Sequence, residues 1–101
     1  MSKRSKATSI SAKTKKIVWD RDGGRCIFCR SPYASPEAHV MSRAYGGRGI
    51  PQNVVTVCFD CHRRMDQTSD REEYLAKAKA YLECFYGSWD ESKVKYKPWT
   101  M

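Results

Sequence analysis

Two Cys-x-x-Cys pairs are the residues of this 101-residue sequence best suited to chemistry. Cys26 and Cys29 form the first pair, and Cys58 and Cys61 form the second. Each pair can place two thiolates on one metal ion, and the two pairs together complete a tetrahedral shell, which suits zinc. Because such a closed shell has no open position, we expect this ion to be structural. Redox chemistry at one pair is the alternative, which the presence of two pairs and the lack of a βαβ pattern disfavour.

The composition explains why so small a chain would need a metal. Hydrophobic residues make up 41% of it, and the mean hydropathy is -0.71. A domain of this size has a thin core, and a structural zinc contributes roughly 10–16 kcal/mol of apparent binding energy to folding. The fifth cysteine, Cys84, falls in the last predicted helix, where we expect a small buried side chain.

Three more polar residues, His39, Asn53 and His62, are spaced among the cysteines. Taken singly, each could be an ordinary surface, core or turn residue. We expect His39 to begin a strand, Asn53 to precede the next strand, and His62 to begin a helix that the second cysteine pair holds in place. A hairpin followed by a helix, braced by zinc, would bring both imidazoles to one cleft.

This order of residues resembles the HNH endonucleases, which share the ββα-metal fold. The resemblance covers about residues 21–67 and is most specific in the segments RDGGRCIFC, AHVMSRAYGG and NVVTVCFDCHRRMD. Within the family, the sequence is most similar to small proteins that bacteriophages and prophages encode. The resemblance implies an α+β fold, a small zinc-braced ββα-metal domain with flanking N- and C-terminal helices.

The resemblance also implies a reaction, the hydrolysis of DNA phosphodiester bonds. Nicks or double-strand breaks would carry 5′-phosphate and 3′-hydroxyl ends. His39 would be the general base that takes a proton from water, a task that suits an imidazole near neutral pH. His62 would bind a catalytic divalent ion such as Mg²⁺ or Mn²⁺, distinct from the structural zinc. Asn53 would tie a loop to the His39 strand by hydrogen bonds rather than react.

The sequence departs from the family just before the general base. Many relatives carry Asp, Glu or His there as a metal ligand, whereas this chain has Ala38. Asp66 is the leading substitute, because it follows His62 by four residues and would share its face of a regular helix. Glu37 is a second candidate, although it would point to the other side of a strand. If Asp66 is only a surface carboxylate, water and substrate phosphate would complete the shell.

The charge of the chain indicates a polyanionic partner. The formal net charge is +8, and residues 1–16 hold basic side chains but no acidic one. Basic residues suit a phosphate backbone because they release condensed counterions, although a solvated tail that aids solubility is the alternative. Guanidinium groups pair especially well with phosphate. The expected contacts to DNA are Arg43, Arg63, Arg64, Lys13, Lys15 and Lys16.

The length favours one domain. We predict a basic flexible arm over residues 1–10 and a single nuclease domain over residues 11–101, with its core motif at 21–67. No apolar run is long enough to span a bilayer or to follow the basic N-terminus as a signal peptide would. We therefore expect the cytoplasm of a bacterial host cell and no contact with a membrane. Similar phage proteins act beside the DNA-packaging terminase, so terminase subunits are a further expected partner.

Hydrophobic spacing and turn residues predict the secondary structure. Helices are predicted over residues 11–20, 61–67 and about 70–86, strands from His39 onward and over 54–57, and a loop over 31–37. The first helix should turn Ile17 and Val18 inward. The last helix should begin with a capping box of Ser69 and Glu72 and end at Gly87. Its core-facing stripe would be Leu75, Ala78, Leu82 and Phe85.

Two other functions are compatible with these residues. One is a non-catalytic zinc module that binds DNA or protein, and the other is a small adaptor whose basic arm contacts an acidic partner. His39 argues for the enzyme, because a pure zinc module needs no imidazole at a strand, whereas Ala38 favours a weakened enzyme. The tail, with Trp89, Tyr96 and Trp99, is expected to lie back over the domain or to form a partner surface.

Overall fold

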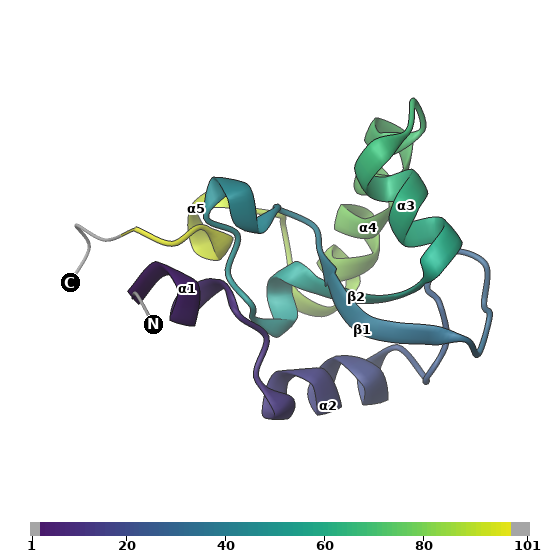
Figure 1. Ribbon diagram of the computed structural model, residues 1–101, viewed down its shortest axis with the longest axis horizontal. Helices are drawn as coiled ribbons and strands as arrows, with labels where there is room; N and C mark the ends of the chain where they lie inside the picture. The colour runs from purple at the N-terminus through teal and green to yellow at the C-terminus, as the bar shows by residue number, and fades with distance from the viewer. Residues whose placement is uncertain (1–2, 98–101) are drawn as a thin grey trace.

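The computed structural model describes residues 3–97, so Trp99 lies outside the described residues. Figure 1 shows a two-stranded sheet with α2 on one side and α3 and α4 on the other. This mixture of two strands and packed helices confirms the predicted α+β, ββα-metal class. In chain order the elements are α1 (Lys3–Thr8), α2 (Ala12–Arg21), β1 (Ala34–His39), β2 (Val54–Cys58), α3 (Phe59–Gln67), α4 (Arg71–Tyr86) and α5 (Glu91–Val94), with short 3-10 turns at Arg43–Tyr45 and Pro51–Asn53.

Strand β1 begins earlier than the sequence predicts. It pairs antiparallel with β2, from Ala34 opposite Cys58 to His39 opposite Val54, and the register shifts between Ser35 and Ala38. His39 therefore ends the strand instead of beginning it, and the expected loop at 31–37 is largely strand. The prediction was wrong because it read Pro36 as a loop residue, whereas a proline is tolerated at an irregularity of an edge strand.

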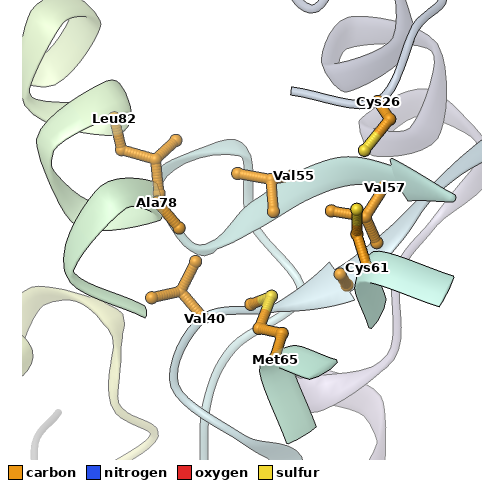
Figure 2. Close-up of a cluster of buried hydrophobic side chains, with 9 residues drawn as sticks. Cys26, Val40, Val55, Val57, Cys61, Met65, Ala78 and Leu82 are labelled. Carbon is orange, nitrogen blue, oxygen red and sulfur yellow. The ribbon is translucent and has the colours of Figure 1, made fainter. Parts of the chain in front are cut away.

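The hydrophobic core lies between the sheet and the helices α3 and α4. Figure 2 shows Met65 of α3 reaching toward Val40, with Val55 and Leu82 on the facing elements. Met65 is fully buried, and Leu82 is 2% exposed. The buried cluster consists of Cys26, Ala38, Val40, Val55, Val57, Cys61, Met65, Ala78 and Leu82. Two zinc-ligand candidates are thus part of the core itself.

A buried ion pair joins α2 to the sheet and to α4. The carboxylate of Asp22, which is fully buried, lies 2.7 Å from Nε of Arg21. It also accepts hydrogen bonds from the hydroxyl of Tyr81 at 2.6 Å and from the backbone N–H of Thr56 at 2.8 Å. Burial and the neighbouring Asp22 carboxylate raise the pKa of Tyr81 to about 12, which keeps its hydroxyl protonated as the donor.

Residues 3–8 are helical, which corrects the prediction of a flexible arm over 1–10. Arg4 donates from its guanidinium to the carbonyl oxygens of Arg43 and Ala44, at 3.1 and 2.7 Å. Thr8 is only 3% exposed. The arm was misjudged because its Lys and Ser residues suggest solvation, while the contacts that order it come from backbone groups 39 and 40 residues away.

The glycine-rich loop, residues 46–49, is bordered by α1 and α5, and Figure 1 shows α1 beside it. The N–H of Gly49 donates to the carbonyl of Ala7 at 3.0 Å, and that of Arg48 donates to Val94 at 2.8 Å. A Cβ atom at Gly47 would overlap the carbonyl of Met41. Glycine is therefore required here for close backbone packing, not only for a tight turn. The tail does lie back over the domain through α5, as one of the two expectations proposed.

Helices α2 and α4 lie close to their predicted positions, but their caps and buried faces differ in part from the prediction. Ser11 caps α2. Of the two residues expected to turn inward, only Val18 does so, because Ile17 is 41% exposed. Helix α4 ends at Gly87, yet its N-cap is Asp70, so the predicted Ser69 capping box is wrong. Ala78 and Leu82 of the predicted stripe are buried, whereas Phe85 is 50% exposed. Cys84 is exposed as well, which corrects the expectation of a buried thiol.

Among residues 3–97, no helix combines the length and the apolarity needed to cross a bilayer.

The buried Asp22 network should contribute measurably to the stability of the zinc-loaded protein. Asp22→Ala should lower the free energy of unfolding by about 3 kcal/mol, because the change leaves the Arg21 guanidinium unpaired and two donors unsatisfied. Asp20→Ala is the matched control, since Asp20 forms only an exposed pair with Lys16, and it should change stability by less than about 0.5 kcal/mol. Urea denaturation with zinc in excess measures both. An equally small decrease in the free energy of unfolding for both variants would show that the Asp22 network adds no stability.

Candidate active site and metal centre

The four cysteines of the two pairs converge on one point. Their sulfur atoms all lie within 4.8 Å of one another, and those of Cys29 and Cys58 are 3.6 Å apart. Ligands at about 2.3 Å from a tetrahedral zinc ion would be roughly 3.8 Å apart, so the spacing fits zinc. Within residues 3–97, this is the only group of three or more cysteine, histidine or carboxylate side chains placed to hold a metal. The predicted four-cysteine metal site is therefore present.

The electrostatics of the cluster favour a bound cation. Burial raises the pKa of Cys61, and the neighbouring sulfurs of Cys58 and Cys26 raise it further. Burial also acts against ionisation of Cys26, but backbone N–H groups around its sulfur, first that of Cys29, outweigh it and lower the pKa. One thiolate thus forms readily, and its negative charge disfavours ionisation of the neighbouring thiols. A divalent cation among the sulfurs removes this repulsion and allows all four to ionise.

The second cysteine pair also positions α3. Cys58 is the N-cap of this helix, and its sulfur accepts a hydrogen bond from the backbone N–H of Cys61 at 3.4 Å. His62 follows Cys61 directly, so the position of its side chain depends on the same Cys58–Cys61 turn. The prediction that the second pair fixes the start of the His62 helix agrees with this geometry.

His39, His62 and Asp66 line one cavity of about 500 Å³. His39 reaches it from the end of β1, and the other two reach it from α3. The remaining wall comes from residues before and within α2, from β1 itself and from the segment after β1. The other lining residues are Ser9, Ile10, Lys15, Glu37, Ser42 and Arg43. The cleft expected between the two imidazoles therefore exists.

His39 is held by a backbone group. Its Nε2 lies 2.8 Å from the carbonyl oxygen of Thr8, and because a carbonyl can only accept, Nε2 carries the proton of the neutral ring and Nδ1 carries the lone pair. Burial lowers the pKa of His39, and the positive charge of Arg43 lowers it further, although the Thr8 carbonyl and Asp66 oppose this shift. The ring is consequently neutral near pH 7.

Asn53 holds the end of β1 to the glycine-rich loop. Its fully buried side chain accepts from the N–H of Met41 at 2.8 Å and donates to the carbonyls of Met41 and Arg48, at 3.1 and 2.9 Å. Every polar atom of the amide therefore has a backbone partner. These are the hydrogen bonds between loop and strand that the family resemblance implies for this residue.

His62 and Asp66 form a close pair on one face of α3. Nε2 of His62 lies 3.0 Å from Oδ2 of Asp66. Two ligands at about 2.1 Å from an octahedral ion and at right angles would be about 3.0 Å apart, so this pair fits two neighbouring positions of such a shell. Both side chains are partly exposed, at 40% and 46%, which leaves room for water or phosphate as further ligands.

The two residues before His39 differ from each other in their surroundings. Ala38 is fully buried in the core, so its methyl group does not face the cavity. Glu37, which the sequence predicted on the other side of the strand, lines the same cavity as His39, because residues two apart share a face. Its carboxylate pairs with Lys15 at 2.9 Å.

The predicted DNA contacts divide into two groups. Arg43 and Lys15 line the cavity. Arg63 and Arg64 do not, and both pair with Asp60, at 3.2 and 3.1 Å. Helical spacing explains this, because Asp60 lies three and four residues before them. Of the lysines outside the cavity, Lys16 pairs with Asp20 at 2.7 Å, and Lys13 is exposed on α2.

The N-terminal contribution to this cavity was not predicted from the sequence. Thr8 supplies the carbonyl that binds His39, and Ser9 and Ile10 form part of the wall. A backbone carbonyl has no side-chain signature, so its residue type could not have shown this role. The one available signal was the absence of acidic residues before Asp20, which leaves this wall positively charged.

The fold and the site together define a zinc-braced ββα-metal domain. Residues 26–74 match the family model described as HNH endonuclease, and this range includes all four clustered cysteines, both histidines, Asn53 and Asp66. The match indicates an HNH endonuclease domain at these residues. Searches among curated proteins and among solved structures give no match.

Removing zinc should unfold the domain. Cys61→Ser, or treatment with a strong chelator under reducing conditions, should abolish stoichiometric zinc and most of the helical circular dichroism, because a structural zinc contributes folding energy directly. Cys84→Ser is the matched control, since Cys84 is exposed on α4 and outside the cluster. Metal analysis and circular dichroism measure both effects. A metal-free protein with native circular dichroism would contradict the structural role.

Proposed function

We propose that this protein is a metal-dependent endonuclease that hydrolyses DNA phosphodiester bonds. The observation that carries the proposal is the cavity that His39 shares with the His62–Asp66 pair in an HNH family domain. A base and a pair of metal-ligand candidates that reach one cavity from two different elements suit attack on a phosphate bound between them. The net charge of +8 supports DNA as the substrate.

His39 would act through Nδ1, which carries the lone pair. A water oxygen forms a bond to phosphorus while its proton passes to Nδ1, and the bond between phosphorus and the 3′ oxygen breaks. The 3′ oxygen takes a proton from solvent, so the products are a 5′-phosphate and a 3′-hydroxyl. The lowered pKa of His39, caused first by burial, keeps the ring ready to accept this proton at neutral pH.

His62 and Asp66 would hold the catalytic divalent ion, Mg²⁺ or Mn²⁺. Their 3.0 Å separation fits neighbouring ligand positions. When bound, such an ion stabilises negative charge on the phosphate and on the departing oxygen. Ala38 lies in the core, so its lack of a ligand atom leaves the cavity itself intact.

Two cations in the cavity suit the phosphate backbone. Arg43 is an exposed residue that lines the cavity, and Lys15 lines it as well, paired with Glu37 at 2.9 Å. Backbone contacts of this kind position DNA without reading its sequence. We therefore propose low intrinsic sequence preference. Action beside a bacteriophage packaging terminase stays a prediction of the family resemblance.

His39→Ala should lower the rate of nicking of supercoiled plasmid by about 100-fold or more, because it removes the proton acceptor. Gel assays with Mg²⁺ or Mn²⁺ measure the rate. Zinc content and circular dichroism should stay at the values of the unchanged protein, which separates loss of the base from loss of fold. Equal nicking by both proteins, purified in the same way, would show that His39 is not the base.

Asp66→Asn should raise the concentration of Mg²⁺ or Mn²⁺ needed for half-maximal nicking by about tenfold or more, because the amide is a weaker ligand than the carboxylate. Asp60→Asn is the matched control. It removes the same charge from the same helix, but Asp60 pairs with Arg63 and Arg64 outside the cavity. Metal titrations of the nicking rate compare the two variants. The same midpoint for both would exclude Asp66 as a ligand.

A further inference from the structure

The N-terminal segment (residues 3–10) lies outside the range that matches the family, yet it is bound firmly to the site. Arg4 donates to the carbonyl oxygens of Arg43 and Ala44, at 3.1 and 2.7 Å. In the other direction, the N–H of Gly49 donates to the carbonyl of Ala7 at 3.0 Å. The segment is thus attached at both ends of the loop that follows β1.

Close packing also fixes where the segment ends. The backbone of Gly49 is buried against Ser9, and a Cβ atom at position 49 would overlap the Ser9 carbonyl. The buried hydroxyl of Thr8 donates to the carbonyl of Arg4 at 3.0 Å. With its side chain and both neighbours held, the carbonyl of Thr8 has a defined direction, and that direction is toward His39.

We infer that the N-terminal segment is a positioning element for the general base, an inference that rests on the proposed function. The carbonyl oxygen of Thr8 lies 2.8 Å from Nε2 of His39 and can only accept. It therefore keeps the ring proton on Nε2 and the lone pair on Nδ1. A neutral imidazole without such a partner divides between two tautomers. Fixing the tautomer and the ring orientation keeps the base in a reactive geometry.

The same segment shapes the side of the cavity that would receive DNA. Ser9 and Ile10 line the cavity beside His39, and Oγ of Ser9 lies 3.4 Å from the guanidinium of Arg43. The base and a phosphate-binding cation therefore share one support. Loosening the segment should disturb proton transfer more than zinc binding, because the zinc site lies on other elements.

Two variants of the full-length, zinc-loaded protein loosen the segment through different atoms. Gly49→Ala displaces Ser9 sterically, and Arg4→Gln removes the guanidinium that binds the two carbonyls. Each should lower kcat for plasmid nicking by about tenfold or more, with zinc content unchanged. Lys6→Gln is the matched control, because it removes the same charge as Arg4→Gln from an exposed position of α1. Lys6→Gln should show the same rise in KM as Arg4→Gln, because the lost charge is the same, but its kcat should be unchanged.

Long-range ¹H–¹⁵N spectra of the imidazoles give a readout independent of activity. The unchanged protein at pH 8 should show His39 as a single tautomer protonated at Nε2, and both loosening variants should shift it toward a mixture. The inference is wrong if the unchanged protein already shows a mixture, or if both variants keep one tautomer and full kcat. A folding defect in one variant leaves the other to decide. If the unchanged protein nicks no DNA while its ring is fixed at Nε2–H, the proposed function fails and the positioning contact stands.

Discussion

The convergence of four cysteine sulfurs is the constraint on which the rest of the structure depends. The sulfurs lie within 4.8 Å of one another, although they come from a turn after α2 and from the junction of β2 with α3. Cys26 and Cys61 are also buried members of the core. In a chain of 101 residues, the metal site and the hydrophobic core are therefore one structure. Cys58 adds a third role by capping α3, so the cysteine cluster also positions the start of the helix that carries His62.

Hydrogen bonds to backbone groups hold several key side chains of this small domain in place. Asn53 satisfies its amide entirely with backbone atoms of Met41 and Arg48, and Asp22 accepts from the N–H of Thr56. Thr8 binds His39 through its carbonyl. A small core cannot order long loops by burial alone, so directional hydrogen bonds to the main chain replace the missing apolar contacts.

The parts of the site that could be predicted are those whose side-chain chemistry is distinctive. The cysteine spacing predicted the cluster, and the four-residue spacing predicted that His62 and Asp66 would meet, as they do at 3.0 Å. The parts that failed depend on long-range contacts. Pro36 lies within β1 because a register shift tolerates it, and Arg63 and Arg64 turn to Asp60 instead of the cavity. Helix α1 was missed because Lys and Ser reveal nothing of the backbone groups that bind it.

The two parts of the cavity wall, one with His39 and one with His62 and Asp66, are stabilised by different interactions. The wall with His62 and Asp66 depends on α3 and hence on the cysteine cluster. The wall with His39 depends on the hydrogen bonds of Asn53 and on the N-terminal segment. Because Met65 and Val55 join these walls through the core, their separation is fixed only when both supports are in place. A family domain of residues 26–74 contains the first support completely and the second only in part, so the position of His39 depends on residues outside the range that matches the family.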